Sequence, residues 1–506
     1  SFPPPIGYRY TLTDTNSSRS IRTWIFLKNN RLFRVLSLTD STDTSSNFIR
    51  RFYATLKPVG PLSGPSVFES KLDTFFRDFY SGDSLTAQRA RDAIPNVYFG
   101  AAGVPALLQA IKTLPYNGKD YFETKTKLIN ELGYINDSIA TMAVVDGLDQ
   151  IYQRSGDTST IQNAVFKALA HHKTLAAYDL LKRLMVQDPP IFENASDYTY
   201  LFQDLGDSLA LARTLFPDLL RLATVDDYKG NVQNLLASLV DSGYIKGPDY
   251  ESYFSQIWFD ARIQWKKQQG KDEKKLQKKE DDADDNNSDG DPDESNGNDL
   301  DDYAILLAPF YDKNPGIPRF FDKLLASKDA ALRLSTAILL LRHDRPVADT
   351  VIRNLAASDA YRSELFRRLT AIDHAEHFPK EYRNQLDMAR SLLASGRGSA
   401  GLADIQFAGK RKVEFKQFDG FVYFFKYKAG RDDDWQIGIS GIQPSNPSDV
   451  NTANEFVSLT GKKLKPGLPV NTQFDDQLRK LMFSKRKSAD HFYMDRSYLD
   501  RSGDDD

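Results

Sequence analysis

The sequence predicts a mainly α-helical protein with β structure at both ends. The helical part is either a HEAT-like α-solenoid or an irregular helical bundle. It lies between a small N-terminal β/α module and a C-terminal α+β domain. Apolar residues recur every three to four positions through the middle of the chain, which is the spacing of one helix face. Runs rich in β-branched and aromatic residues occur near both ends, and such runs are typical of strands.

Composition limits the classes of function. The chain has 506 residues, of which 41% are hydrophobic and 27% charged, as in globular proteins. The chain has 66 Lys and Arg and 69 Asp and Glu. This near balance of charge argues against a dedicated nucleic-acid binder, which carries a basic excess. The absence of cysteine excludes disulfides, thiolate metal sites and cysteine nucleophiles, and it fits an oxidising extracytoplasmic compartment. No apolar run reaches the roughly eighteen residues of a membrane-spanning helix.

Residues 1–62 are expected to form a partial module of one β-hairpin and one helix. Residues 21–27 and 32–38 are strand-like, and Asn30 between them tolerates the positive φ of a tight turn. Residues 48–53 predict a short amphipathic helix. Because a hairpin and one helix make too small a core, we expect the Ser1 end to be processed or truncated, with further strands upstream.

Residues 63–270 and 303–398 are expected to be helical repeats. Two segments of about thirty residues, 157–187 and 328–358, each predict a pair of helices joined by a turn, which is the scale of solenoid repeats. The positions predicted to face inward are Ile161, Val165, Ala168, Leu169, Leu175, Tyr178, Leu181, Leu184 and Met185 in the first pair, and Leu332, Leu334, Ile338, Leu341, Val351, Ile352 and Leu355 in the second.

Residues 271–302 are predicted to be a charged, disordered loop, because the acidic stretch from Glu280 to Asp302 has too little apolar area to offset the entropy of ordering. Asp285, Asn287 and Asp289 have the spacing of the first three ligands of a calcium loop. The twelfth position is Asn296, so the bidentate glutamate of that motif is missing. The alternative is a loop that attracts cations diffusely.

Residues 399–506 are expected to form a β-rich domain with one helix over 474–483. Asp419-Gly420 predicts a hairpin turn, and residues 435–439 a third strand. Phe421, Tyr423, Phe425 and Tyr427 alternate along one strand face, and with Trp435 they are candidates for a partner-binding surface. The alternative is that this face is covered internally.

The remaining motifs predict no catalytic residue and no cofactor. His374 and His377, with Glu376 between them, are a candidate metal pair, although the spacing is not that of H-E-x-x-H, and a solvent-facing polar turn is the alternative. Residues 396–401 spell G-x-G-x-x-G but follow a helix, which predicts a linker, because a dinucleotide loop follows a strand. Residues 438–441 fall short of a nucleophile elbow.

Residues 424–428 (Phe-Phe-Lys-Tyr-Lys) and 434–444 (Asp-Trp-Gln-Ile-Gly-Ile-Ser-Gly-Ile-Gln-Pro), together with 48–52 (Phe-Ile-Arg-Arg-Phe), resemble parts of large Gram-negative envelope proteins of the TraB/GumN type. The resemblance implies the non-catalytic C-terminal region of such a protein. The histidine and glutamate motifs of the family's N-terminal domain have no counterpart here, so no catalytic position is carried over.

These observations predict a non-enzymatic scaffold outside the cytoplasm, in the periplasm or at the cell surface. It would bind a protein or envelope component through a helical-repeat surface or the aromatic hairpin. The alternative is an accessory region of a metal-dependent hydrolase whose catalytic domain lies upstream. A cytoplasmic protein is a third hypothesis.

Overall fold

The computed structural model confirms the predicted fold class: the chain is mainly helical, with two small antiparallel sheets. It describes residues 6–13, 19–28, 30–40, 47–56, 64, 68–116, 120–156, 158–192, 194–281, 299–395, 402–415, 418–429, 434–453 and 456–487. The chain forms two compact units, Ser70–His343 and Ser1–Glu69 with Asp344–Asp506. The break falls inside the region 303–398 that the sequence predicts as one helical stretch.

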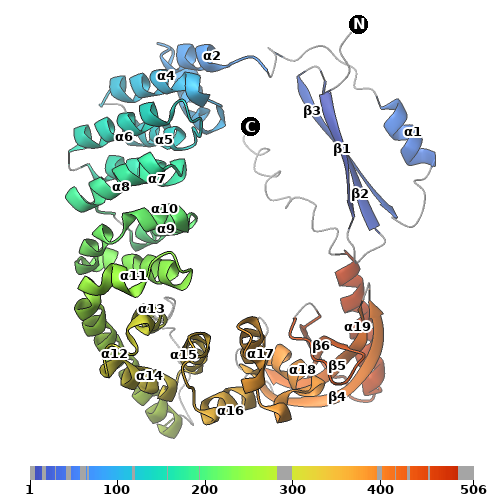
Figure 1. Ribbon diagram of the computed structural model, residues 1–506. Helices are drawn as coiled ribbons and strands as arrows, with labels where there is room; N and C mark the ends of the chain where they lie inside the picture. The colour runs from blue at the N-terminus through green and yellow to red at the C-terminus, as the bar shows by residue number, and fades with distance from the viewer. Residues whose placement is uncertain are drawn as a thin grey trace. The chain divides into compact units, whose positions relative to one another are not determined.

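The N-terminal module contains three strands and one helix (Figure 1). Strands β1 (Ile6–Thr13), β2 (Arg19–Lys28) and β3 (Arg31–Asp40) form an antiparallel sheet in the order β1-β2-β3, and α1 (Asn47–Thr55) follows. Asn30 has φ 60°, which confirms the predicted turn between β2 and β3. Strand β1 was not predicted, although its run of alternating residues contains three β-branched and two aromatic side chains, which favour a strand.

The helical unit is a stack of helix pairs of the HEAT-like kind. Its elements are α2 (Leu72–Phe79), α3 (Ser84–Asp92), η1 (Ile94–Asn96), α4 (Gly100–Thr113), α5 (Tyr121–Gly133), α6 (Thr141–Ser155), α7 (Ser159–His172), α8 (Leu175–Gln187), α9 (Ala195–Gly206), α10 (Leu209–Ala212), η2 (Arg213–Leu215), η3 (Asp218–Thr224), α11 (Asp226–Asp241), η4 (Gly247–Tyr253), α12 (Phe254–Asp281), α13 (Asp299–Leu307), η6 (Ala308–Phe310), α14 (Gly316–Ala326) and α15 (Ala330–Arg342).

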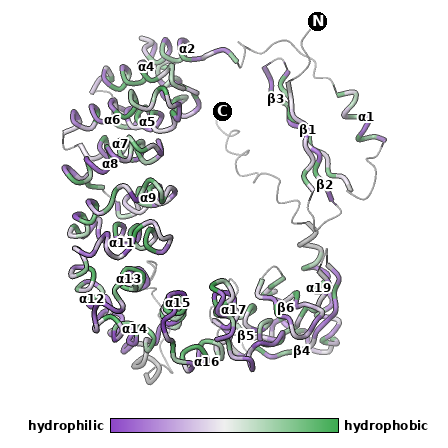
Figure 2. The backbone as a smooth tube through the Cα atoms, viewed as in Figure 1, coloured by the Kyte–Doolittle hydropathy of each residue, from purple (hydrophilic) through white to green (hydrophobic). Residues whose placement is uncertain are grey.

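Two layers run through this stack (Figure 1). Helices α5, α7, α9, α11, α13 and α15 pack in succession in one layer, and α4, α6 and α8 pack in succession in the other. Hydrophobic and hydrophilic residues alternate along these helices (Figure 2), as expected where each helix buries one face. At the closest crossing, a Cβ on Gly133 of α5 would lie 2.7 Å from the backbone oxygen of Ala168 in α7, so glycine allows the two backbones to meet.

Most of the predicted inward positions of the helical unit are buried. Ile161, Val165, Ala168 and Leu169 are buried on α7, and Tyr178, Leu181, Leu184 and Met185 on α8. Two positions of this unit that were predicted to face inward are not fully buried. Leu175 is 56% exposed, because it is the first residue of α8 and the turn before it places it at the edge of the stack. Ile338 is only half-buried on α15, since the buried face of that helix is formed by its neighbours Ala337, Leu339 and Leu340.

Helix α12 continues beyond the predicted start of the charged loop at residue 271 and ends at Asp281. The reason is a buried carboxylate. Asp272 accepts hydrogen bonds from the Ser327 hydroxyl at 2.9 Å, the Lys328 backbone N–H at 2.9 Å and the Gln268 amide at 2.8 Å. These bonds hold the helix against the turn that follows α14. Asp285, Asn287 and Asp289, the candidate calcium ligands, lie outside the described residues.

His172 makes the stability of the helical unit depend on pH. The side chain is 1% exposed at the end of α7, and neither ring nitrogen has a hydrogen-bond partner. Burial lowers the pKa of His172 below its ordinary value of 6.5, so the unfolded chain takes up a proton that the folded chain does not. The contribution of His172 to the free energy of unfolding is therefore expected to be fully present above pH ~6.5. It should fall as the pH drops towards the lowered pKa, by at most ~1.4 kcal/mol per pH unit.

Urea unfolding between pH 7.5 and 5 would measure this loss. His172→Leu should remove the part of the pH dependence due to this side chain. The neighbouring His171 is a matched control, because it is more exposed and lies 3.5 Å from the Asp204 carboxylate. If His171→Leu removed the slope and His172→Leu did not, the buried imidazole would not be its source.

The C-terminal part combines short helices with a four-stranded antiparallel sheet (Figure 1). Its elements are α16 (Asp349–Ala357), α17 (Arg362–Ala371), η7 (Ala375–His377), η8 (Lys380–Tyr382), α18 (Gln385–Ala394), β4 (Leu402–Phe415), β5 (Phe418–Ala429), β6 (Gln436–Pro444), β7 (Ser458–Lys463) and α19 (Val470–Lys487). The strand order is β4-β5-β6-β7. The three predicted strands and the predicted helix are present, and β7 is additional.

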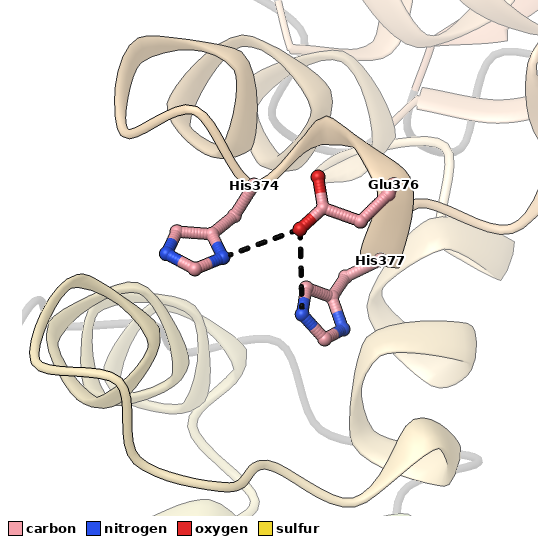
Figure 3. A group of neighbouring side chains, drawn as sticks. All are labelled: His374, Glu376 and His377. Carbon is pink, nitrogen blue, oxygen red and sulfur yellow. Dashed lines mark ion pairs between the residues drawn. The ribbon is translucent and has the colours of Figure 1, made fainter.

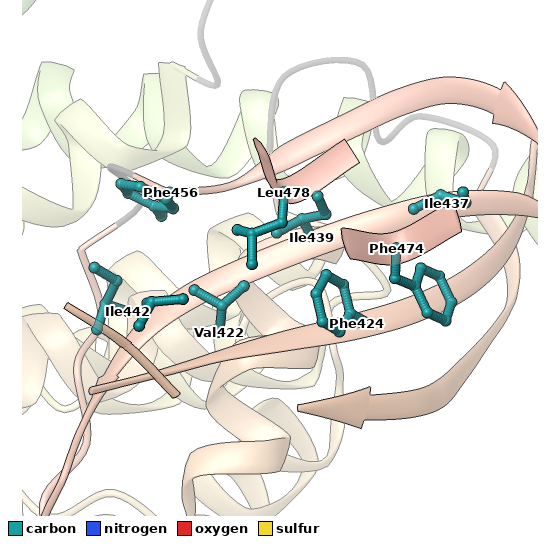
Figure 4. Packing of buried hydrophobic residues seen from close by; sticks show 9 residues of the cluster. Val422, Phe424, Ile437, Ile439, Ile442, Phe456, Phe474 and Leu478 are labelled. Atoms are coloured by element: carbon teal, nitrogen blue, oxygen red, sulfur yellow. The ribbon is translucent and has the colours of Figure 1, made fainter. Parts of the chain in front are cut away.

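Both faces of this sheet are covered. Val422, Phe424 and Ile439 face Phe474 and Leu478 of α19 (Figure 4). Tyr423 and Phe425 project to the opposite face and pack against Ala389 and Leu393 of α18.

The predicted turn at Asp419-Gly420 is wrong. Both residues lie inside β5, and Phe415 pairs with Phe418 across the hairpin, so the turn falls between those two residues. Gly420 serves another purpose: a Cβ there would lie 2.1 Å from the backbone oxygen of Gln443 in β6. The glycine permits close approach of the next strand, a role that the sequence signal for a turn does not distinguish.

Candidate functional site

Helix α1 packs on one face of the N-terminal sheet through a single tyrosine. The Tyr53 hydroxyl donates to the backbone oxygen of Arg22 at 2.9 Å, and the Tyr53 ring stacks on Trp24 with centroids 6.2 Å apart. Trp24 also contacts Phe26, with centroids 4.1 Å apart. Because alternate strand residues share a face, α1 lies over the face that carries Trp24 and Phe26. This anchor sets the distance between α1 and β1, which leaves a cavity.

The cavity has a volume of about 820 Å³ and is lined by residues of β1, β2 and α1. Trp24, Phe26 and Ile49 give it apolar walls. Arg9, Arg22, Lys28 and Arg50 also line it, and among its described lining residues there is no Asp or Glu. We call this space the α1 cavity.

Arg9 and Arg50 are held in place at the α1 cavity. The Arg9 guanidinium lies 4.4 Å from the centroid of the Trp24 ring, within the range of a cation–π interaction. Arg50 donates to the Asn47 side-chain oxygen at 2.7 Å. Cationic groups next to buried aromatic rings form a site suited to an anion with an apolar body.

The opposite face of the same sheet is apolar and open to solvent. Strand pairing places Ile21 between Leu12 and Leu38, and Leu27 beside Leu32. We call this surface the open sheet face; its apolar members are Tyr8, Tyr10, Leu12, Ile21, Ile25, Leu27, Leu32, Leu36 and Leu38. Tyr8 is 78% exposed, Leu32 70% and Leu12 47%. A contiguous apolar patch of this kind marks an interaction surface.

Neither surface was predicted from the sequence. The strand-like runs at 21–27 and 32–38 were interpreted as a hairpin with too small a core. A signal for the open sheet face exists: apolar residues alternate in phase along all three strands at 8–12, 21–27 and 32–38. Which of the two faces stays open depends on where α1 packs, and the sequence pattern does not contain that information.

The structure corrects the predicted aromatic hairpin surface. Tyr423, Phe425 and Tyr427 are buried, at 5%, 0% and 2% exposure. Helix α18 covers this face, and the Tyr423 hydroxyl donates to the Gln385 side-chain oxygen of α18 at 3.1 Å. Phe421 is half-buried, with the Lys410 ammonium 4.5 Å from its ring centroid.

Trp435, the other member of that predicted surface, is half-buried. The ammonium groups of Lys426 and Lys428 lie 5.4 and 5.2 Å from its ring centroid. These five aromatic side chains therefore form packing contacts within the domain, and as a group they do not present an open docking face.

The structure brings together the predicted metal candidates His374 and His377 (Figure 3). They flank Glu376 in the turn at η7, where Glu376 Oε1 lies 3.4 Å from His374 Nδ1 and 3.8 Å from His377 Nε2. One ligand atom from each of the three residues lies within 4.8 Å of the others, a set that zinc accepts. The Glu376 side chain is 65% exposed, and His374 Nδ1 is buried with no hydrogen-bond partner among the described residues. Metal binding here stays a prediction.

The other motifs offer no site. Residues 396–401, with the G-x-G-x-x-G pattern, lie outside the described residues. Gly438, Ser440 and Gly441 lie inside β6, and Ser440 is fully buried. A Cβ on Gly438 would lie 2.7 Å from Leu393 Cδ2 of α18, so this glycine serves helix–sheet packing. Within the described ranges, no helix is both long and apolar enough to cross a membrane.

The fold therefore defines a helical-repeat protein with two β-containing parts, one of which carries an open apolar face and a basic cavity. No protein-family model matches the chain, and no curated protein matches it. The resemblance to proteins of the TraB/GumN type consequently has no support from a sequence family.

Among solved structures, the chain is similar to the complex of CpcE and CpcF of phycocyanin lyase from Nostoc sp. PCC7120. The two are 14% identical, and the match covers 63% of this chain and 99% of that chain, with a TM-score of 0.23. A similarity this low assigns no activity, substrate or partner to the present protein.

The same finding overturns the prediction that the chain is not an enzyme. That prediction took helical-repeat architecture and the lack of a recognised motif as evidence against catalysis. The matched structure is a complex of a phycocyanin lyase, and neither helical-repeat architecture nor the lack of a recognised motif excludes an activity in a chain.

Proposed function

We propose that this chain is a protein-binding scaffold whose contact surface is the open sheet face. The observation that supports the proposal is the row of exposed apolar side chains contributed by all three strands. A sheet buries each apolar face against a second layer of structure, and α1 supplies that layer on one face only. A partner protein would supply it on the other.

The size of the open sheet face fits a protein contact. Strands of 8 to 10 residues span about 27–34 Å at ~3.4 Å per residue. With strands ~4.8 Å apart, the sheet covers on the order of 400 Å² in plan, which is within the range of roughly 300–600 Å² for the largest apolar patch on a monomer, a patch that is often functional.

The charge of the open sheet face suggests the chemistry of the partner. Arg34 of β3 is exposed and pairs with Ile25 in register, so it projects from this face partway along the edge strand. A suitable partner would present a strand layer or a helix with an apolar face and one acidic side chain opposite Arg34. Such an ion pair would fix orientation more than affinity.

The helical unit would contribute an extended surface of its own, because stacked repeats expose long faces for recognition. The absence of cysteine supports placing this interaction outside the cytoplasm, and fractionation of the source cells would test that location.

Site-specific photo-crosslinking in extracts of the source organism tests the proposal. A photoreactive phenylalanine analogue would replace Leu36 in the open sheet face, and Phe48 on the exposed side of α1 as the matched control. We expect one protein to be cross-linked from position 36 and not from position 48. That protein, once purified, should bind the full chain, and Leu32→Asp with Leu36→Asp should weaken binding by ~100-fold or more, because two apolar contacts are lost and charges are buried.

Three outcomes would contradict the proposal. They are cross-linking from position 36 to a second copy of the chain, cross-linking to lipid, and equal yields from positions 36 and 48. Failure of the aspartate variants to weaken binding of the purified partner would likewise place the contact elsewhere. Circular dichroism of each variant would verify that the module is still folded.

A further inference from the structure

We propose that the α1 cavity binds a small amphipathic anion, with an acyl or aromatic body and a carboxylate or phosphate head. Trp24, Phe26 and the cations of this site lie on the face of the sheet opposite the open sheet face, and only Tyr10 and Thr23 of its described lining residues belong to the open side. The proposed ligand therefore does not require the proposed partner. Three observations support the site: the volume of the cavity, the aromatic surface of its walls and the sign of the charge around it.

The volume and walls fit a small molecule. Ligand sites in proteins measure roughly 300–1,000 Å³ and are mostly apolar, with a few polar groups, and the α1 cavity is about 820 Å³. Trp24 and Phe26 of β2 are at most 9% exposed, and Tyr53 of α1 stacks on Trp24. These rings form a wall held on both sides, by the sheet and by the helix. The body of the ligand would lie along it.

The charge around the cavity selects an anion. The whole chain has a net charge of −3, yet residues 1–62 contain nine Lys or Arg and three Asp or Glu. Four of these nine cations line the α1 cavity, and Arg9 is fixed over the Trp24 ring. Arg9 and Arg50 are exposed, and Arg22 and Lys28 are half-buried. These four cations therefore give the mouth of the cavity a positive potential that attracts anions. The anionic head would lie between Arg9, Lys28 and Arg50.

Calorimetric titration of the full chain with four probes tests the apolar body and the anionic head of the ligand separately. The probes are dodecanoate, dodecyl phosphate, dodecanol and inorganic phosphate, each below its aggregation concentration. Dodecanoate or dodecyl phosphate is expected to bind at least ~10-fold more tightly than dodecanol, since hydrogen bonds between charged groups are stronger than those to a neutral hydroxyl. Inorganic phosphate should bind much more weakly than dodecyl phosphate. Preference for one of the two anions would identify the head group as carboxylate or phosphate.

Variants locate the site. Lys28→Gln with Arg50→Gln should weaken binding of the preferred anion by ~10-fold or more and leave dodecanol binding unchanged. Arg34→Gln, on the opposite face of the same sheet, is the charge-matched control and should have no effect at moderate salt. Lys28 and Arg50 are not buried, so the double variant is expected to fold, and its melting temperature would verify this.

The proposal would be overturned by the absence of binding of both amphipathic anions. Equal affinity for dodecanol and for the anions would show an unselective apolar pocket. If Arg34→Gln weakened anion binding as much as the Lys28 and Arg50 double variant, the anion would be attracted by the overall positive charge of the module and not by a specific site.

Discussion

Replacing Arg362 by methionine is expected to lower the free energy of unfolding of the C-terminal part by ~3–5 kcal/mol. The guanidinium is buried, and it donates to the backbone oxygens of Ala356 at 2.7 Å, Ala357 at 3.0 Å and Asp387 at 3.0 Å. It also pairs with Asp359 at 2.6 Å. One side chain therefore caps the end of α16 and ties it to the start of α18. Its loss removes three hydrogen bonds to backbone oxygens and leaves Asp359 without this ion pair, and breaking a buried charged network costs this much.

Arg367 on the same helix is the matched control. It pairs with Glu364 at 2.6 Å, but its side chain is 56% exposed. Its hydrogen bond lowers the pKa of the Glu364 carboxyl, yet an exposed pair of this kind contributes less than ~1 kcal/mol. Arg367→Met should therefore change stability little.

Urea unfolding followed by hydrogen exchange of α16, α17 and α18 would compare the two variants. Equal and small effects would mean that water replaces the bonds made by Arg362. Equal and large effects would mean that the exposed Arg367 pair is as important as the buried network.

The helices of the repeat unit were predictable because their signal is local. Ile161, Val165 and Leu169 lie on one face of α7 by spacing alone, and all three are buried. The signal fails at element ends. Leu175 belongs to the same periodic pattern but is exposed at the first position of α8. Asp272 lies in a charged segment that was predicted to be a loop, yet two hydrogen bonds from residues outside α12, and one from a residue one turn earlier in α12, keep it in a helix.

The candidate sites were less predictable, because exposure is a tertiary property. Tyr423 and Phe425 alternate along β5 just as Leu36 and Leu38 alternate along β3. Helix α18 covers the first pair, whereas the second pair is exposed. Sequence alternation predicts that a strand has an apolar face but not whether a helix packs there. The distinction comes from Gln385 and Leu393, which hold α18 on the sheet.

The second large effect is expected at Phe424 of β5, where alanine should lower the free energy of unfolding of the sheet domain by ~3–5 kcal/mol. Phe424 is 1% exposed, and its ring stacks on Phe474 of α19 with centroids 4.9 Å apart and planes at 13° (Figure 4). Removing the ring opens a cavity between sheet and helix. Neighbouring strands fix the backbone on both sides of β5, so the cavity does not close by relaxation.

Phe407 of β4 is the matched control, because it is the same residue type in the neighbouring strand but is 43% exposed. Phe407→Ala should cost less than half as much, since much of its ring already contacts water. Hydrogen exchange of β4, β5 and α19 at increasing urea concentration would report the unfolding midpoint of this domain in each variant. If the two alanine variants lost the same stability, the contact between Phe424 and Phe474 would contribute no more than an exposed ring. Packing of α19 on β5 would then not stabilise the domain.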